Sequence, residues 1–261
     1  KVGLTSGTDY KNLMEETKIS KLSPYLMPIA VVIAGGLIAG AVLLNGSTEK
    51  VTQQKNTNPT AQNVPEQQVG STDAVAKVTD KDHIKGNPDA LVKIVEYSDF
   101  ECPFCKQFHN TMNEIMDKYG ASGEVAWVFR QFPLDQLHPV KAQAVAVASE
   151  CANEQGGNDT FWKFTDRYFE LTLTNNRTDI DVVIPQIAKE IGLDIPAFNT
   201  CRQSGKYNEH IQGDIANAVA TGGRGTPWSV VIAPNGKTFP INGAQPLGAV
   251  EQIIELAKKE K

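Results

Sequence analysis

The sequence contains few cysteines and has no excess of basic charge. Its 261 residues include only four cysteines, too few for the disulfide-dense scaffold of a small secreted domain. Lysine and arginine total 25 against 30 aspartates and glutamates, a formal net charge of −5. The chain therefore lacks the basic field that attracts nucleic acid. Hydrophobic residues make up 41%, which excludes disorder throughout its length.

Charged residues are missing from a long stretch near the N-terminus. Residues 23–48 carry none, and within them YLMPIAVVIAGGLIAGAVLL, residues 25–44, supplies the roughly 20 apolar residues that a bilayer-spanning helix needs. A buried soluble helix of this length would normally keep a polar face. A cleaved signal peptide normally has an apolar core of only ~7–15 residues. We predict a retained transmembrane anchor over residues 25–44, with these two as the alternatives.

The lysines around this span predict its orientation. Four lysines precede the span and two follow it closely: Lys1, Lys11, Lys18, Lys21, then Lys50 and Lys55. An excess of lysine marks the cytoplasmic side of a membrane. Residues 1–24 are therefore predicted to be a cytoplasmic tail of a single-pass protein of the cell membrane. The larger C-terminal part is predicted to be extracytoplasmic, where disulfides persist.

Residues 45–78 are poor in large apolar side chains and rich in Gln, Asn, Thr and Pro. Such a composition cannot bury enough surface to offset its ordering entropy, so this segment is predicted to be a flexible polar linker. The folded domain is predicted to span residues 79–261.

The pattern of this domain indicates an α/β fold. ALVKIVEY, residues 90–97, is a β-rich apolar run; a helical periodicity follows from Cys102, and then EVAWVFRQF, residues 124–132, is a second β-rich run. Strand, helix and strand in this order imply a parallel βαβ unit. A helical insertion follows over about residues 138–222. WSVVIAPNGKTFPI is then typical of a hairpin, and an amphipathic helix over residues 247–260 closes the chain.

Two cysteines of the segment ECPFCKQFH stand where the first helix begins. Pro103 suits a first helical turn, and the amide donors there favour a thiolate on Cys102. Cys105 lies about one turn on, facing the same side. A zinc site is the first alternative, but it needs four ligands in closely spaced pairs, whereas Cys151, Cys201 and the four histidines are scattered. A static disulfide in so short a loop would add little stability. We therefore predict a redox-active pair and no metal.

VEYSDFECPFCKQFH followed far downstream by GTPWSVVIAPNGK resembles a DsbA-type thiol–disulfide oxidoreductase of the thioredoxin-fold superfamily. The resemblance covers residues 79–261 and includes the helical insertion. A bare Cys-x-x-Cys is a weak signal, but a preceding strand, a helix start and a later Thr-Pro before a strand make it specific. The resemblance implies an enzyme with a thioredoxin-like fold and no bound cofactor.

The resemblance also implies roles for individual residues. Cys102 would be the exposed nucleophile and Cys105 the buried resolving thiol. Pro227 would be a cis-proline facing the pair, and Thr226 would offer backbone hydrogen bonds to an extended substrate peptide. An ordinary trans-proline at a strand start is the alternative for Pro227, because only about 5–6% of X–Pro bonds are cis.

Four further positions near the pair also receive expectations. Glu96 would be a buried acid that moves a proton on or off Cys105; a solvent-facing strand residue is the alternative. Pro103 and Phe104 would tune the redox potential. The best-known relatives have histidine where Phe104 stands, so we expect a less oxidising pair. His109 is expected to be a surface residue without a catalytic role.

The resemblance pairs Cys151 with Cys201 as a structural disulfide, with two buried free thiols as the alternative. The function that it implies is the introduction of disulfides into exported polypeptides, with reoxidation by a quinone-linked membrane partner. A reductase or isomerase that uses the same atoms is the first alternative. The second is a non-enzymatic extracytoplasmic binding module whose cysteines are structural.

Overall fold

The computed structural model describes residues 70–261. The predicted cytoplasmic tail, the predicted span over residues 25–44 and most of the predicted linker lie outside the described residues. Within residues 70–261, no helix has both the length and the apolar character that crossing a membrane requires.

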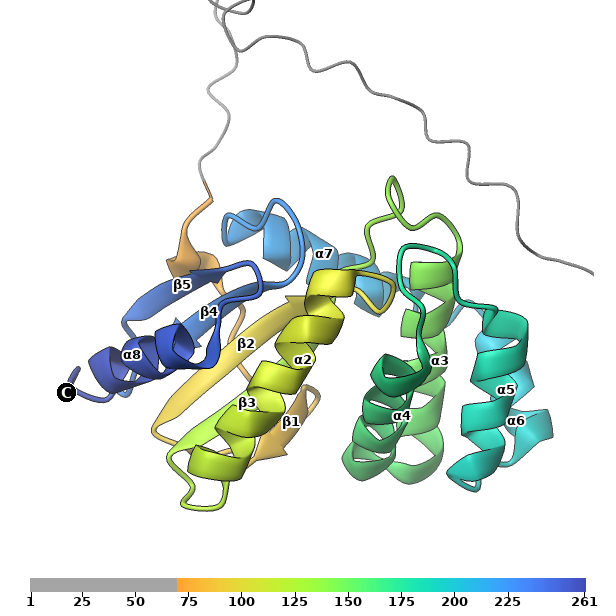
Figure 1. Ribbon diagram of the computed structural model, residues 1–261, viewed down its shortest axis with the longest axis horizontal. Helices are drawn as coiled ribbons and strands as arrows, with labels where there is room; N and C mark the ends of the chain where they lie inside the picture. Colours follow the sequence, from red (N-terminus) through yellow and green to blue (C-terminus); the bar gives the residue numbers. More distant parts are fainter. Residues whose placement is uncertain (1–69) are drawn as a thin grey trace, which may run out of the picture. The chain divides into compact units, whose positions relative to one another are not determined.

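A mixed β-sheet forms the centre of the described part of the chain (Figure 1). Its strands are β1 (His83–Gly86), β2 (Val92–Ser98), β3 (Val125–Gln131), β4 (Trp228–Ile232) and β5 (Thr238–Asn242), in the order β1-β3-β2-β4-β5. β2 and β3 are parallel, whereas the other neighbours are antiparallel. The predicted parallel βαβ unit and C-terminal hairpin are therefore confirmed. β1, an edge strand of four residues, was not predicted.

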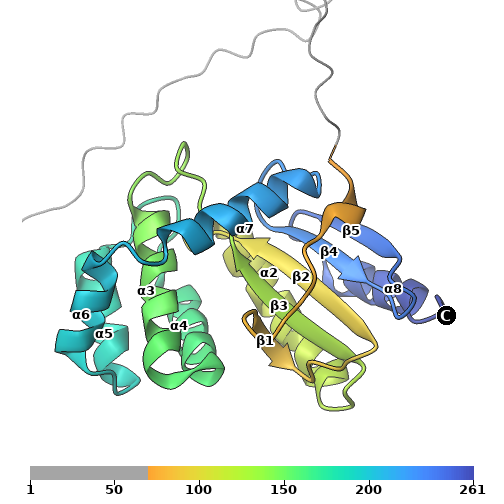
Figure 2. The same ribbon diagram turned by 180° about the vertical axis from the view of Figure 1, so that it is seen from behind.

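Helices cover both faces of this sheet. α2 (Pro103–Ile115) and α8 (Leu247–Ala257) lie on one face, and η2 (Met116–Gly120), a π-helical turn, continues α2. α7 (Asn208–Ala220) crosses the opposite face (Figure 2). Side chains of β2 alternate between the two: Ile94 joins the core beneath α2, whereas Val95 and Tyr97 join the smaller core beneath α7.

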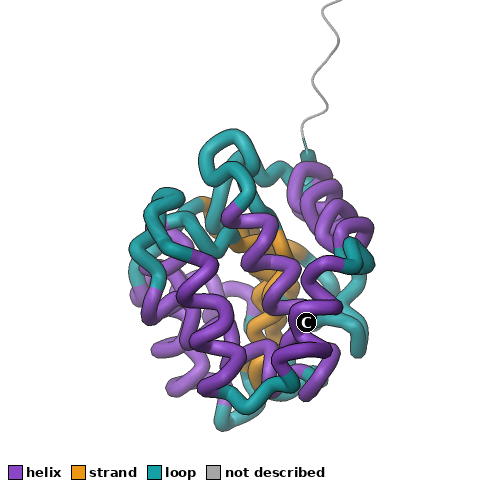
Figure 3. Tube along the Cα trace, turned by 90° about the vertical axis from the view of Figure 1, so that its right-hand side faces the viewer, coloured by secondary structure: helices purple, strands orange, loops and turns teal. Residues whose placement is uncertain are grey.

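The helical insertion lies between β3 and β4, as predicted. Its helices α3 (Lys141–Gly156), α4 (Asn158–Leu171), α5 (Ile180–Glu190) and α6 (Ile195–Gln203) form a lobe beside the sheet, and α7 leads back to it. Seen from the side, helices lie on both sides of the central strands (Figure 3). A disulfide between Cys151 and Cys201 joins α3 to α6, with the two Cα atoms 5.8 Å apart.

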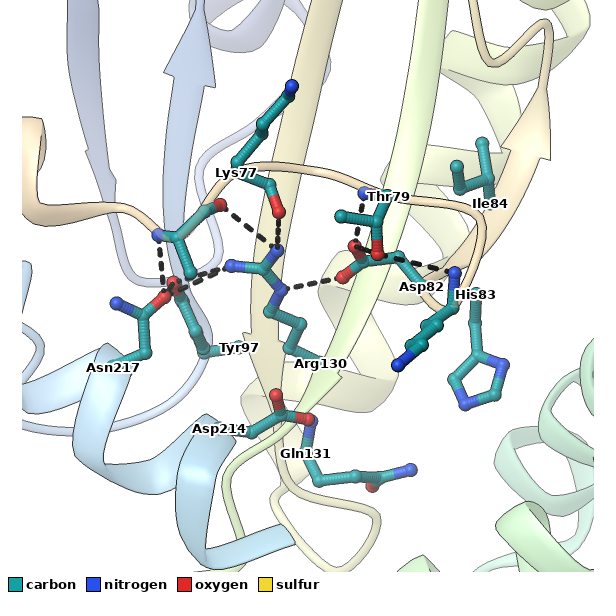
Figure 4. Close-up of polar contacts among 12 residues, drawn as sticks. Lys77, Thr79, Asp82, His83, Ile84, Tyr97, Arg130, Gln131, Asp214 and Asn217 are labelled. Atoms are coloured by element: carbon teal, nitrogen blue, oxygen red, sulfur yellow. Dashed lines mark hydrogen bonds and ion pairs between the residues drawn. The ribbon is translucent and has the colours of Figure 1, made fainter. Parts of the chain in front are cut away.

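The start of the folded domain differs from the prediction. Residues 70–78, expected to belong to the linker, pack against the sheet and contain η1 (Thr72–Ala74). The buried guanidinium of Arg130 donates to the carbonyl of Ala76 at 3.1 Å and forms an ion pair with Asp82 at 2.8 Å (Figure 4). Asn217 of α7 accepts from the amide of Ala76 at 3.0 Å. These partners lie more than 50 residues away, so local composition did not reveal them.

The disulfide of the insertion gives a stability prediction. Its cysteines are 50 residues apart in sequence, and closing a loop of this size lowers the entropy of the unfolded chain, a stabilisation of about 4 kcal/mol. Replacing both Cys151 and Cys201 with alanine should lower the free energy of unfolding by about this amount, measured by urea denaturation of the oxidised proteins. Alkylation and mass spectrometry of the wild-type protein under oxidising conditions provide the control. If both thiols were found free, the pairing would be wrong.

Candidate active site

The redox pair lies where the chain passes from β2 into α2. β2 ends at Ser98 and α2 begins at Pro103. Cys102 is the N-cap, with an extended backbone, and Pro103 takes the first helical position, where a missing N–H costs nothing. The Cys102 amide donates to the carbonyl of Asp99 at 3.1 Å, which closes the turn. The sulfur of Cys102 therefore lies beside the first free amides of the helix, as the sequence predicts.

Cys102 is held as the more acidic thiol. Its pKa is lowered from 9.0 to about 6, chiefly by a hydrogen bond from the Cys105 thiol. Burial opposes the shift, while Thr226 and the amides of Cys105 and Phe104 add to it. Cys102 is only 5% exposed, so the expected exposed nucleophile lies just below the surface. Phe104, 60% exposed, is the part of the motif that projects into solvent.

Cys105 has the opposite electrostatic environment. It is fully buried, and the amide of Asp99 donates to its sulfur at 3.4 Å. Burial raises the pKa of this thiol well above its usual value, and so do its hydrogen bond to Cys102 and the charges of Cys102 and Glu96. Both cysteines are free thiols in the structure. The pair thus consists of a sulfur that ionises easily and a neighbour that keeps its proton.

Glu96 is a buried acid of β2, on the face of the sheet that α2 covers. Its Oε2 accepts from the indole of Trp127 at 2.8 Å, and its Oε1 has no partner among the described residues. Burial raises the pKa of Glu96 to about 7; Ser98 and Trp127 act against the rise, and Cys102 adds to it. The alternative of a solvent-facing residue is wrong, because Glu96 is fully buried.

The peptide bond between Thr226 and Pro227 is cis. The Cys102 thiol donates to the Thr226 carbonyl at 3.4 Å, so the loop before β4 faces the redox pair. The alternative prediction, an ordinary trans-proline at position 227, is therefore wrong. Three separate segments bring the predicted site residues together. The start of α2 provides Cys102 and Cys105, β2 provides Glu96, and the loop before β4 provides Thr226 and Pro227.

Asp99 organises the loop that holds the pair, and it was not singled out from the sequence. Its Oδ1 accepts from the amide of Glu101 at 2.7 Å, and its Oδ2 accepts from His138 Nδ1 at 2.9 Å and from the amide of Leu134 at 2.8 Å. The pKa of His138 is raised, first by this hydrogen bond to Asp99 and also by the charges of Asp99 and Cys102. The protonated form of His138 is thereby favoured near a site whose motif carries phenylalanine.

Glu101 joins the same loop to the helical insertion. Its Oε1 accepts from the hydroxyl of Tyr168 at 2.6 Å and from that of Thr172 at 3.1 Å, and its carbonyl accepts from the amide of Asn175 at 2.7 Å. Both Asp99 and Glu101 are buried. In the sequence, only the segment SDFE directly before the first cysteine, where two acids flank one aromatic residue, could have pointed to these two residues. Their partners could not be inferred.

Two other sequence expectations need comment. His109 is not a surface residue: it is 3% exposed, packs against Trp127 and Phe169, and donates to Asp166 at 2.8 Å. Burial lowers its pKa although Asp166 acts in the opposite direction. The period of α2 turns this side inward, toward the sheet. Cys151 and Cys201 lie in the insertion, bonded to each other and separate from the redox pair.

Comparison with known proteins places this geometry in a family. A family model described as thioredoxin matches residues 78–255. The chain therefore belongs to this thioredoxin family.

Solved structures with the same fold include DsbA-type proteins. DsbA2 of Pseudomonas aeruginosa is 27% identical with a TM-score of 0.60, and the match covers 70% of this chain and 98% of that one. BdbD of Bacillus subtilis is 23% identical with a TM-score of 0.57, over 67% and 92% of the two chains; at this identity it shows the fold alone. The match to DsbA2 and the paired free thiols described above support a thiol–disulfide oxidoreductase activity for this domain.

Curated relatives match in sequence over a small part of their length. The Na(+)/H(+) antiporter NhaA 1 of Mycolicibacterium gilvum is 33% identical over 177 residues, which is 66% of this chain and 26% of that protein. NhaA 3 of Salinispora tropica is 32% identical over 164 residues, which is 63% of this chain and 22% of that protein. The chain thus spans about a quarter of the length of these relatives.

The unequal thiols predict selective alkylation of the reduced protein. Iodoacetamide should modify Cys102 with a rate that rises through a midpoint near pH 6, because the thiolate is the reacting form. Cys105 should stay unmodified over this range, because its pKa is raised. Peptide mass spectrometry identifies the modified residue, and Cys102→Ser serves as the control. A midpoint near the ordinary value of 9.0 would contradict the stabilised thiolate.

The buried acid predicts a pH-dependent stability. The pKa of Glu96 is raised in the folded state from 4.5 to about 7, so the folded state binds the proton more tightly and loses stability as the pH rises between these values. Below about pH 4.5 the carboxyl is protonated in both states and costs nothing. Above about pH 7 it is ionised in both states, and its burial costs on the order of 3 kcal/mol.

Glu96→Gln should remove this cost. The variant should therefore gain stability over the wild type progressively from about pH 4.5 to about pH 7. Urea denaturation of the reduced proteins across this range measures the difference. Glu114→Gln, at an exposed position of α2, is the matched control and should show no such trend. A pH-independent difference for Glu96→Gln would mean that Glu96 has an ordinary pKa.

Proposed function

We propose that the chain introduces disulfide bonds into exported polypeptides. The observation that supports this most directly is the opposed acidity of the pair, with Cys102 held as a thiolate and Cys105 as a thiol. Stabilising the thiolate stabilises the reduced enzyme, which makes the Cys102–Cys105 disulfide easier to reduce and hence a better oxidant. The disulfide within the insertion supports a location where disulfides persist.

The residues support a balanced sequence of exchanges. A substrate thiolate attacks Cys102 of the oxidised enzyme, the bond between Cys102 and Cys105 breaks, and Cys105 leaves with the electron pair and takes up a proton. Glu96, with a pKa of about 7, can supply that proton near neutral pH. A second substrate thiolate then attacks the substrate sulfur of the mixed disulfide and releases Cys102 as a thiolate. The substrate is oxidised by two electrons and the enzyme is reduced.

Exposed apolar side chains surrounding the pair support an unfolded polypeptide as the substrate. Phe104 projects from the motif, and Leu137, Val140 and Leu173 are each more than 60% exposed. Leu137 and Val140 flank His138, which contacts Asp99, and Leu173 follows Thr172, which contacts Glu101. The three residues therefore lie on the two loops that border the Cys102 end of α2.

The location and the electron acceptor are parts of the same proposal. Residues 25–44 would anchor the chain in the cell membrane as a single-pass protein, with residues 1–24 in the cytoplasm and the catalytic domain outside. The linker would then run from residue 45 to about residue 69. A quinone-linked membrane partner would reoxidise the dithiol, and tethering would keep the domain near that partner.

A disulfide reductase is the second candidate, because the pKa of Cys102 is lowered only moderately. A pKa of about 6 lies closer to thioredoxin's value of about 7 than to DsbA's value of about 3.5. Phenylalanine at position 104 agrees with a less oxidising pair. The same two sulfur atoms would then catalyse the reverse reaction, in which the reduced Cys102–Cys105 pair attacks a substrate disulfide.

A refolding assay and a potential measurement test the proposal. The oxidised protein should accelerate disulfide formation in reduced ribonuclease, and Cys102→Ser should lose this activity completely, because the attacked sulfur is absent. Activity retained in Cys102→Ser would favour a non-enzymatic binding module instead.

The reduction potential of the pair, measured against glutathione, decides the direction. A value toward about −120 mV supports the oxidase, whereas one near about −270 mV supports the reductase.

A further inference from the structure

A group of titratable side chains lies at the junction of the sheet and the helical insertion, and the redox chemistry does not use it. His83 opens β1, Glu150 lies in α3, and His210 and Asp214 lie one turn apart on α7. Figure 4 shows Asp214 reaching from α7 toward Gln131, where it accepts from the backbone amide at 2.9 Å. Three separate segments, the sheet, α3 and α7, thus bring their side chains to one point.

The spacing of these side chains fits the coordination shell of a metal ion. One ligand atom each from His83, Glu150 and His210 lies within 4.8 Å of the other two. His83 Nε2 is 2.9 Å from Glu150 Oε2, and His210 Nε2 is 3.7 Å from Glu150 Oε1 and 3.8 Å from Asp214 Oδ2. Metal bonds of about 2.0–2.2 Å in a tetrahedral site put ligand atoms roughly 3.3–3.6 Å apart. Asp214 lies outside this set of three, so its side chain would have to rotate toward the ion to complete the shell.

The charge balance of this group also favours a cation. Glu150 is 2% exposed and the side chain of Asp214 is 14% exposed, so two carboxylates lie near each other in a poorly solvated region. Asp214 Oδ2 accepts a hydrogen bond from the backbone amide of Gln131 at 2.9 Å, which is an uncharged partner. Arg130 is already paired with Asp82 at 2.8 Å. A divalent ion bound between the two carboxylates would balance the charge of both.

The surroundings hold the ligands in place. His83 stacks on Phe161 with ring centroids 3.5 Å apart, which fixes the plane of the imidazole. Gln131 is fully buried and donates from Nε2 to Glu150 Oε1 at 2.8 Å, and its own Oε1 has no partner among residues 70–261. Partners of this kind orient the ligands in metal sites. His210, with a side chain 42% exposed, gives an ion access from solvent.

We propose that His83, Glu150 and His210, with Asp214 as the fourth ligand, bind a divalent transition-metal ion of the zinc type. Two imidazoles and two carboxylates suit such an ion, whereas calcium and magnesium prefer oxygen ligands alone. The bound ion would fix α3 and α7 of the insertion to β1 of the sheet. The site would be structural, since its four protein ligands leave no open position.

Thermal unfolding of the oxidised full chain tests the site, because closing the Cys102–Cys105 disulfide removes the thiols that would also bind zinc. Zinc chloride at a hundredfold excess over its dissociation constant should raise the melting temperature by about 5–10 °C. His210→Gln should weaken zinc binding at least tenfold, measured by calorimetry. Because the His210 side chain is 42% exposed, this variant should fold like the wild type. Glu209→Gln, exposed on the same helix, is the matched control and should bind zinc like the wild type.

A second readout uses cobalt as the probe. Co²⁺ bound to the oxidised wild-type protein should give the visible absorption of a tetrahedral site with nitrogen and oxygen ligands, and His210→Gln should lose it. The proposal is overturned if millimolar zinc leaves the melting temperature unchanged or if His210→Gln binds zinc as tightly as the wild type. It is also overturned if calcium stabilises the protein as much as zinc does, since that would point to a site of oxygen ligands.

Discussion

The hydrogen bond between two sulfur atoms at the start of α2 is the interaction on which the chemistry of this chain depends. By donating to Cys102, Cys105 lowers the pKa of its neighbour to about 6 and raises its own. Two chemically identical side chains thereby acquire different roles three residues apart. The helix contributes the amides of Phe104 and Cys105, and the sheet contributes the buried position of Cys105. Neither element alone would separate the two thiols.

The loop before this helix transmits the position of the pair to the rest of the domain. Asp99 contacts both cysteines through its backbone and His138 through its carboxylate. Glu101 binds Tyr168 and Thr172 of the insertion. A buried carboxylate without hydrogen-bond partners is costly. The contacts of Asp99 and Glu101 therefore hold this loop against the chain segments that follow β3. The insertion is therefore part of the support of the site, and it also provides the exposed apolar loops around it.

The burial of Glu96 at the active site lowers the stability of the domain. Glu96 is buried beneath the pair with one oxygen unpaired among the described residues, and its pKa of about 7 reflects a desolvated carboxyl. A glutamine at this position would keep the hydrogen bond to Trp127 and avoid the charge, but it could not exchange a proton with Cys105. The disulfide of the insertion and the ion pair of Arg130 with Asp82 lie away from the pair and contribute stability elsewhere.

The sequence by itself determined the strand–helix–strand unit, the hairpin, the insertion and the position of the redox pair, because apolar periodicity, turn residues and a Cys-Pro-x-Cys helix start are local signals. It missed β1, placed the domain start too late and took His109 for a surface residue. Tertiary structure alone decided that Thr226 meets Cys102, that His138 and Glu101 join the site, and that residues 70–78 pack on Arg130. These contacts join residues that lie 39 to 124 positions apart, and only the folded chain brings such partners together.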